Sequence, residues 1–285
     1  MSRPRSTADA SIAGGRDRSR TSTYFDELLA RITEAGHRIG FVERDYRIAG
    51  RSVRLRCVGP ALVTTLTRAF AHLASHPVDE PMLTVYLSDG SVVDLPPSPW
   101  DLPNNTPATG SEPEAGPLVH VRDERVDGLF HLDGASLSMI DHASRVAVLW
   151  TVSPESVPAY ERAAPLRAIL DWWGRDHGWH VVHAGAVGTE KGGVLLVGKA
   201  GSGKSTAVLA CLGSGLLYAG DDGVAVGEGP VPLVHSLYCT AKLELGHLRR
   251  MLPPLAALLE GSEESYQGKR MFFLDRQRSA ELSRG

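Results

Sequence analysis

Residues 193–206 read Gly-Val-Leu-Leu-Val-Gly-Lys-Ala-Gly-Ser-Gly-Lys-Ser-Thr, an apolar run, a glycine-rich turn and the start of a helix-like run. The turn fills the pattern G-x-x-x-x-G-K-[ST] with Gly198, Gly203, Lys204 and Ser205, which is typical of a loop that binds phosphate groups. Glycines allow the backbone amides of such a loop to point at an anion. The sequence therefore predicts a strand, a phosphate-binding loop, a helix and a nucleoside triphosphate as ligand. A glycine-rich turn without a ligand is the alternative.

Two side chains of the turn have expected contacts of their own. Lys204 would reach the outer phosphates as a point charge, and the Ser205 hydroxyl is in the position that ligates Mg²⁺. We therefore expect ATP and Mg²⁺ as the bound groups.

Two carboxylates follow the next apolar run along the chain. Residues 216–219, Leu-Leu-Tyr-Ala, are followed by Gly220, Asp221, Asp222 and Gly223. Carboxylates at the end of a strand, just after a phosphate-loop helix, lie where phosphoryl transfer needs them. One could bind the metal while the other accepts the proton of an attacking hydroxyl. A solvated Asp-Asp turn is the alternative interpretation.

A histidine precedes the loop by about 15 residues, at the end of the strand-like run His180-Val-Val-His183. Alone, a histidine on an apolar strand is more often a hydrogen-bonded core residue than a catalytic one. The order of His183, the glycine-rich loop and Asp221-Asp222, however, resembles the HPr kinase/phosphorylase family and the HPr kinase-related serine kinases, which are phosphate-loop proteins akin to phosphoenolpyruvate carboxykinase.

That resemblance covers about residues 180–225 and implies an ATP-dependent serine/threonine kinase acting on a small protein or peptide. It implies that Asp221 is the catalytic base supported by His183, that Lys204 takes part in catalysis, and that Mg²⁺ lies near Ser205 and Asp222. The nucleotide-binding residues expected on this basis are Gly198, Ala200, Gly201, Ser202, Gly203, Lys204, Ser205 and Thr206. The resemblance also raises the alternative of a homo-oligomer.

The chain departs from that family after the aspartates. The long glycine-containing motif that supports phosphorylase activity is not recognisable between Gly223 and Leu245, which argues against that activity. Gly223 offers no side chain to pack at the strand end, and the sequence stops at Gly285. Both features motivate an alternative function, a catalytically weak or inactive nucleotide-binding regulatory protein. The sequence lacks Asn-Lys-x-Asp and Leu-Ser-Gly-Gly-Gln motifs, so a GTPase switch and an ABC-type ATPase are weaker candidates.

Composition argues against several other classes. A net charge of −3 over 285 residues does not favour binding to nucleic acid through a general basic surface. No apolar run approaches the roughly 20 residues of a membrane span, and the first residues lack the apolar segment of a secretory signal. We expect no nucleic-acid or membrane partner and a cytoplasmic location. The cysteines, at positions 57, 211 and 239, are too far apart to predict a zinc site or a disulfide framework.

Lysine is rare in this chain. Of 30 lysine and arginine residues only five are lysine, at positions 191, 199, 204, 242 and 269. Lys242 or Lys269 could neutralise charge on a transferred phosphoryl group, although a solvated surface lysine is the commoner case.

These patterns predict an α/β fold with a C-terminal phosphate-loop kinase domain, built on a mixed sheet, over residues 118–285. A small α+β region is expected at 23–97, a disordered tail at 1–22 and a linker or loop at 98–117. Among the local elements we expect a helix at 23–34, a hairpin of 83–87 with 91–95, and a helix at 160–175.

Overall fold

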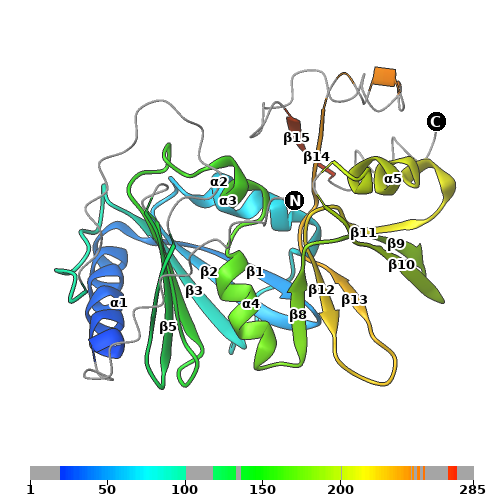
Figure 1. Cartoon of the computed structure of the whole chain (residues 1–285). Coiled ribbons are helices and arrows are strands. Elements are labelled where there is room, and N and C mark those ends of the chain that lie inside the picture. The colour runs from blue at the N-terminus through cyan, green and yellow to red at the C-terminus, as the bar shows by residue number, and fades with distance from the viewer. Residues whose placement is uncertain are drawn as a thin grey trace, which may run out of the picture. The chain divides into compact units, whose positions relative to one another are not determined.

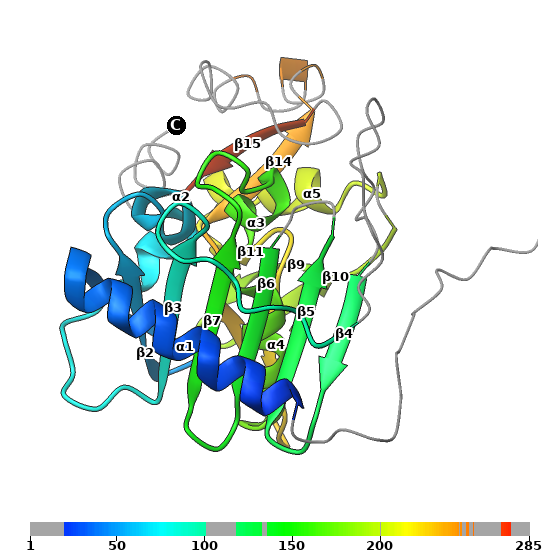
Figure 2. The ribbon, with the colours of Figure 1, turned by 90° about the vertical axis from the view of Figure 1, so that its left-hand side faces the viewer.

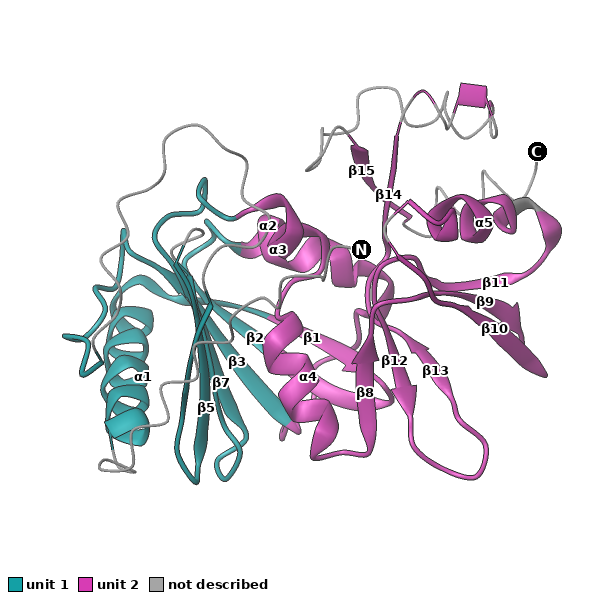
Figure 3. Cartoon of the chain, viewed as in Figure 1, with its two compact units in different colours: residues 1–43, 55–62, 83–157 teal, residues 44–54, 63–82, 158–285 magenta. Residues whose placement is uncertain are grey.

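The computed structural model describes residues 20–100, 118–132, 136–199, 201–244, 246, 249–250, 253 and 269–274. The chain forms two compact units, shown in two colours in Figure 3. Unit 1 comprises residues 1–43, 55–62 and 83–157, and unit 2 comprises residues 44–54, 63–82 and 158–285. Among the described residues, no helix is long and apolar enough to cross a membrane.

The largest sheet is mixed and has seven strands in the order β1-β2-β3-β7-β6-β5-β4. These strands are β1 (Phe41–Ile48), β2 (Arg51–Val58), β3 (Leu83–Asp89), β4 (Leu118–Arg122), β5 (Val126–His131), β6 (Ser136–Asp141) and β7 (Val146–Thr151). β4 to β7 pair in antiparallel fashion, whereas β3 pairs with β7 in parallel. The residues of β1 and β2 are divided between the two units. A mixed α/β fold with a mixed sheet is therefore confirmed.

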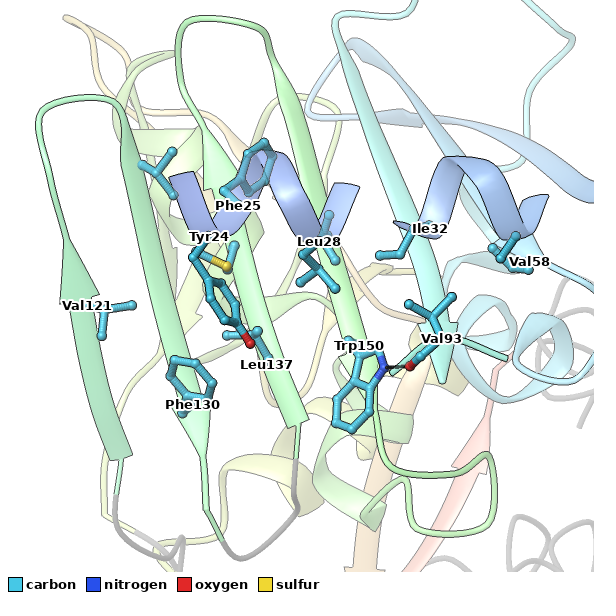
Figure 4. Packing of buried hydrophobic residues seen from close by; sticks show 14 of the residues in the cluster. Tyr24, Phe25, Leu28, Ile32, Val58, Val93, Val121, Phe130, Leu137 and Trp150 are labelled. Carbon is cyan, nitrogen blue, oxygen red and sulfur yellow. Dashed lines mark hydrogen bonds between the residues drawn. The ribbon is translucent and has the colours of Figure 1, made fainter. Parts of the chain in front are cut away.

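Helix α1 (Arg20–Ile39) lies across strands β3, β7, β6 and β5 of unit 1 (Figure 2). Its buried residues Tyr24, Phe25, Leu28 and Ile32 recur at helical spacing and pack into the core on the sheet (Figure 4). In the same core, the Trp150 indole donates a hydrogen bond of 2.7 Å to the carbonyl of Val93. The helix predicted at residues 23–34 is confirmed and is longer at both ends.

Two predicted segments fall largely outside the described residues. Of the predicted tail, residues 1–19 lie outside them, and residues 20–22 belong to α1. Of the predicted linker, residues 101–117 lie outside them.

The hairpin predicted across Asp89-Gly90 is wrong. β3 forms, but residues 91–95 are not a strand, because the N–H of Ser91 is bonded instead to the carboxylate of Asp89. The N–H of Gly90 donates to the carbonyl of Thr151 at the end of β7. β3 therefore takes a partner far along the chain in place of its sequence neighbour.

Unit 2 carries the glycine-rich loop and its surroundings. Its helices are α2 (Val63–Thr67), η1 (Arg68–Leu73), α3 (Ala159–Ala163), α4 (Arg167–Arg175), α5 (Lys204–Ala210) and η2 (Leu212–Ser214). Apart from its parts of β1 and β2, its described strands form three small sheets (Figure 1). These are β10 (Gly192–Leu196), β9 (Gly185–Thr189) and β11 (Leu217–Gly220); β13 (Val234–Ser236), β12 (Val224–Gly227) and β8 (Trp179–Val182); and β14 (Thr240–Glu244) with β15 (Lys269–Phe273).

The helix predicted at residues 160–175 is divided into α3 and α4. Leu166 has a φ of 61°, a left-handed conformation that a continuous helix cannot contain. Its N–H donates to the buried carboxylate of Glu161 over 2.8 Å. Trp172 and Trp173 are both buried, and Trp173 packs edge-to-face on Trp179 of β8.

The compact units differ from the predicted ranges 23–97 and 118–285. Residues 118–157 belong to unit 1, because β4 to β7 continue the sheet that contains β3. The glycine-rich loop, His183 and the two aspartates all lie in unit 2.

Candidate nucleotide-binding and catalytic site

The glycine-rich loop lies between β10, which ends at Leu196, and α5, which begins at Lys204. Strand, turn and helix therefore occur where the sequence predicts them. Gly201 and Gly203 have φ angles of 78° and 87°, which a residue with a side chain adopts only with strain. The glycines at these two positions are required by the backbone path of the turn.

Lys204 holds the loop in a curved path. Its ammonium group donates hydrogen bonds to the carbonyl of Gly198, over 2.7 Å, and to the carbonyl of Lys199, over 3.1 Å. The side chain at the end of the turn is thus bonded to the backbone at its start.

Helix α5 packs closely on β9. A Cβ atom added to Gly185 would lie 2.4 Å from Cγ2 of Val208, a distance that no real Cβ contact allows. Gly185 therefore permits the helix that follows the loop to lie against the strand that follows His183.

Asp221 directly follows β11 and is almost fully buried, with 3% of its surface exposed. Its Oδ2 accepts a hydrogen bond from the backbone N–H of Lys242 over 3.2 Å, whereas its Oδ1 has no hydrogen-bond partner within the described part of the chain. Burial raises the pKa of the Asp221 carboxyl from 3.8 to about 6, although hydrogen bonds from Ser205 and from the Lys242 N–H oppose the rise.

Asp222 has the opposite electrostatic environment. Its Oδ2 is 2.8 Å from the ammonium nitrogen of Lys242, and its Oδ1 is 3.4 Å from Nδ1 of His183. Burial alone would raise the pKa of this carboxyl, but the charge and hydrogen bond of Lys242, with contributions from His183 and Arg167, lower it below its ordinary value. Asp222 is therefore ionised wherever the protein is folded near neutral pH.

His183 lies in the two-residue connection between β8 and β9, directly after the strand on which it was predicted. Its side chain is about half exposed, at 52%. Burial lowers its pKa, and the positive charges of Arg167, Lys204 and Lys242 lower it further, while Asp222 opposes them. The imidazole is consequently neutral at neutral pH and can accept a proton.

These groups line one cavity of about 410 Å³, a size within the usual range for small-molecule sites. The predicted residues that line it are His183, Gly201, Ser202, Gly203, Lys204, Ser205, Thr206, Asp221 and Asp222. Gly198 is not among the described residues that line the cavity; its carbonyl accepts a hydrogen bond from Lys204. Ala200 lies outside the described residues.

The cavity has further lining residues that the sequence did not identify as members of the site. Tyr160, Leu243 and Glu244 gave no signal, because they lie on α3 and β14, far from the motif in sequence. Lys242 and Lys269, rare lysines that the sequence marked as able to neutralise a transferred phosphoryl group or else as solvated surface residues, both line the cavity.

Gly223 does not leave the end of β11 loosely packed. A Cβ atom at this position would lie 3.2 Å from the ring of Tyr238, which is itself buried. The aromatic ring thus occupies the space that a side chain at Gly223 would need.

The residues present fit a magnesium ion. The carboxylate of Asp222, which is ionised, and the Ser205 hydroxyl are oxygen donors that line the same cavity. The described residues contain no group of three or more histidine, cysteine or acidic side chains placed to hold a metal. Magnesium commonly uses one or two carboxylates together with water and substrate phosphates, so a small ligand set of this kind suits it.

No protein-family model and no curated protein matches the chain.

Proposed function

We propose that this protein is an ATP-dependent kinase that transfers the terminal phosphoryl group to a serine or threonine hydroxyl of a small protein or peptide. One observation carries the proposal. Two adjacent carboxyls with oppositely displaced pKa values, Asp221 and Asp222, line the same cavity as a glycine-rich loop and its lysine. A carboxyl with a pKa near the working pH can accept a proton, and its ionised neighbour supplies a fixed negative charge.

In this proposal the loop at residues 201–204 binds the phosphates of ATP, and Lys204 neutralises their charge. The acceptor oxygen attacks the γ-phosphorus, and a new O–P bond forms as the bond from that phosphorus to the β,γ-bridging oxygen breaks. ADP leaves with the electron pair of the broken bond. The hydroxyl proton passes to Oδ1 of Asp221, which has no other hydrogen-bond partner among the described residues.

Two further groups support the transfer. Ser205 and Asp222 would hold Mg²⁺, which when bound neutralises charge on the phosphates. His183 is neutral, and its Nδ1 lies 3.4 Å from Oδ1 of Asp222, so it would orient the Asp222 carboxylate. It can also receive a proton from the side of the cavity where the acceptor hydroxyl binds.

The test separates nucleotide binding from transfer. Protein is incubated with Mg²⁺, ATP labelled in its γ-phosphate, and the products of neighbouring genes as candidate acceptors. Asp221→Asn should bind ATP almost as well as the wild type but transfer no label, whereas Lys204→Ala should lose ATP binding itself. Lys191→Ala, a change at an exposed lysine of the β9–β10 turn, is the matched control and should behave as the wild type.

Two outcomes would contradict the proposal. Equal loss of ATP affinity in Asp221→Asn and Lys204→Ala would contradict the role of Asp221 as the base. Tight binding of ATP by the wild type with transfer to no acceptor would favour the nucleotide-binding regulatory protein instead.

A further inference from the structure

The positive charge that lines the cavity comes from an unusual choice of residue. Arginine outnumbers lysine 25 to five in the chain, yet the three residues with fixed positive charge in the described lining are Lys204, Lys242 and Lys269. Arginine presents a planar fork, whereas lysine presents a compact charge on a flexible stem that can move from one oxygen to another. The cavity is therefore lined by ammonium groups on flexible side chains.

Lys242 is directed into the cavity by the strand that carries it. Successive side chains of a strand point to opposite faces, and on β14 the neighbour Leu243 is buried in a core cluster with Leu209 and Phe272. The Lys242 side chain, 21% exposed, consequently lies on the other face of β14 and lines the cavity, which Leu243 and Glu244 of the same strand also border.

Hydrogen bonds at the start of β14 fix its position. The Thr240 hydroxyl donates to the carbonyl of Ala163 over 2.6 Å, and the Tyr218 hydroxyl donates to the carbonyl of Thr240 over 2.9 Å. The strand that carries Lys242 is thus hydrogen-bonded both to α3 and to β11.

Lys242 contacts both aspartates through different atoms. Its backbone N–H donates to Oδ2 of Asp221, and its ammonium group donates to Oδ2 of Asp222. Lys204, at the start of α5, and Lys242, on β14, both line the cavity, so two ammonium groups reach it from different elements. Lys204 lies at the glycine-rich loop, and Lys242 lies at the two aspartates.

We propose that Lys242 is a second phosphate-contacting residue, which binds the terminal phosphoryl group of the nucleoside triphosphate from the side of Asp221 and Asp222. The inference rests on the nucleotide site proposed above. The phosphoryl group to be transferred must lie between the loop and the base, and the ammonium group of Lys242 is bonded to Asp222, the residue next to the base. Its flexible stem allows it to leave the Asp222 carboxylate for a phosphoryl oxygen.

The test compares affinities for two nucleotides, measured by calorimetry with Mg²⁺. The probes are ADP and a non-hydrolysable ATP analogue. Lys242→Met should weaken binding of the triphosphate analogue by about 10- to 100-fold, the usual worth of one hydrogen bond to a charged group, and should change ADP binding less than about twofold. Lys242→Arg should recover part of the lost affinity because it keeps the charge. Lys191→Met, at an exposed lysine away from the cavity, should change neither affinity.

If Lys242→Met does not fold, Lys242→Gln replaces it in both affinity measurements.

The outcomes distinguish this inference from the proposed kinase activity. Equal loss of ADP and triphosphate affinity, or no loss of either, overturns the role of Lys242. A wild type that prefers triphosphate through Lys242 but transfers no phosphoryl group supports this inference and contradicts the kinase. A wild type that binds neither nucleotide overturns both.

Discussion

The carboxyl groups of Asp221 and Asp222 are adjacent in the chain, yet their pKa values are displaced in opposite directions. Both are withdrawn from water, but only Asp222 is paired with an ammonium group, that of Lys242. Near neutral pH the site therefore contains one permanently ionised carboxylate and one carboxyl that can exchange a proton.

The pH dependence of phosphoryl transfer should report the Asp221 carboxyl. A base must be deprotonated to act, and the pKa of Asp221 is about 6, so kcat/KM should fall about tenfold per pH unit below pH 6. Asp222→Asn should move this acid limb to lower pH, since the Asp222 charge raises the pKa of Asp221. Steady-state rates between pH 4.5 and 8 test both statements. A rate that stays constant down to pH 5 would show that another group accepts the proton.

Removal of the same carboxyl should stabilise the protein in the absence of nucleotide and Mg²⁺. The pKa of Asp221 is raised from 3.8 to about 6 in the folded state, so the wild type loses stability as the pH rises through this window. Asp221→Asn should avoid that loss and raise the free energy of unfolding at pH 7.5 by about 3 kcal/mol.

Urea unfolding at pH 4 and pH 7.5 measures this difference, which should nearly vanish at pH 4. Asp79→Asn, at an exposed aspartate of the same unit, is the control and should change little at either pH. A variant less stable than the wild type at pH 7.5 would mean that the Asp221 carboxylate is not electrostatically strained.

Close packing of α5 on β9 should make Gly185→Ala destabilising. The added methyl group would overlap Val208, and overpacking of this kind costs about 1–3 kcal/mol. Because α5 follows the loop, nucleotide affinity should fall as well. The double variant Gly185→Ala/Val208→Ala should recover much of the stability. Gly227→Ala, where the nearest atom would lie 3.6 Å away, is the matched control for the loss of glycine.

The buried carboxyl of Glu161 should give the protein a second pH-dependent contribution to stability. Burial raises its pKa from 4.5 to about 7, so stability should decline as the pH rises from about 4.5 to 7. Glu161→Gln retains an acceptor for the Leu166 N–H but cannot ionise, and should flatten the decline. Free energies of unfolding at pH 5 and pH 8 measure the slope. The exposed Glu190→Gln should leave the slope unchanged, and an unaltered slope in Glu161→Gln would contradict the assignment.

The elements that depend on neighbours in sequence were predictable. The strand, glycine-rich loop and helix at residues 192–210 and the placement of Asp221 after a strand follow from local patterns. Pairing between distant strands was not predictable in the same way. The Asp89-Gly90 turn forms, but β3 pairs on one side with β2 and on the other with β7, which is more than 50 residues away, and no local pattern encodes the pairing with β7.

The residues of the site likewise fall into those that local sequence predicts and those that depend on distant segments of the chain. His183, Lys204 and Asp221 were found from their order and spacing, whereas Lys242 enters through the position of β14 beside the end of β11. The only sequence signal for it was the scarcity of lysine in an arginine-rich chain. Composition could mark the residue as unusual but could not place it.

The bond that holds Asp221 comes from the backbone of residue 242 and not from its side chain. Every amino acid except proline supplies that N–H group. Substitution at this position can therefore change the charge that faces the cavity while the carboxyl at position 221 keeps its hydrogen bond. In evolutionary terms the two properties are separable. A single codon change at position 242 can alter how the cavity binds the nucleotide, while the hydrogen bond to the Asp221 carboxyl remains.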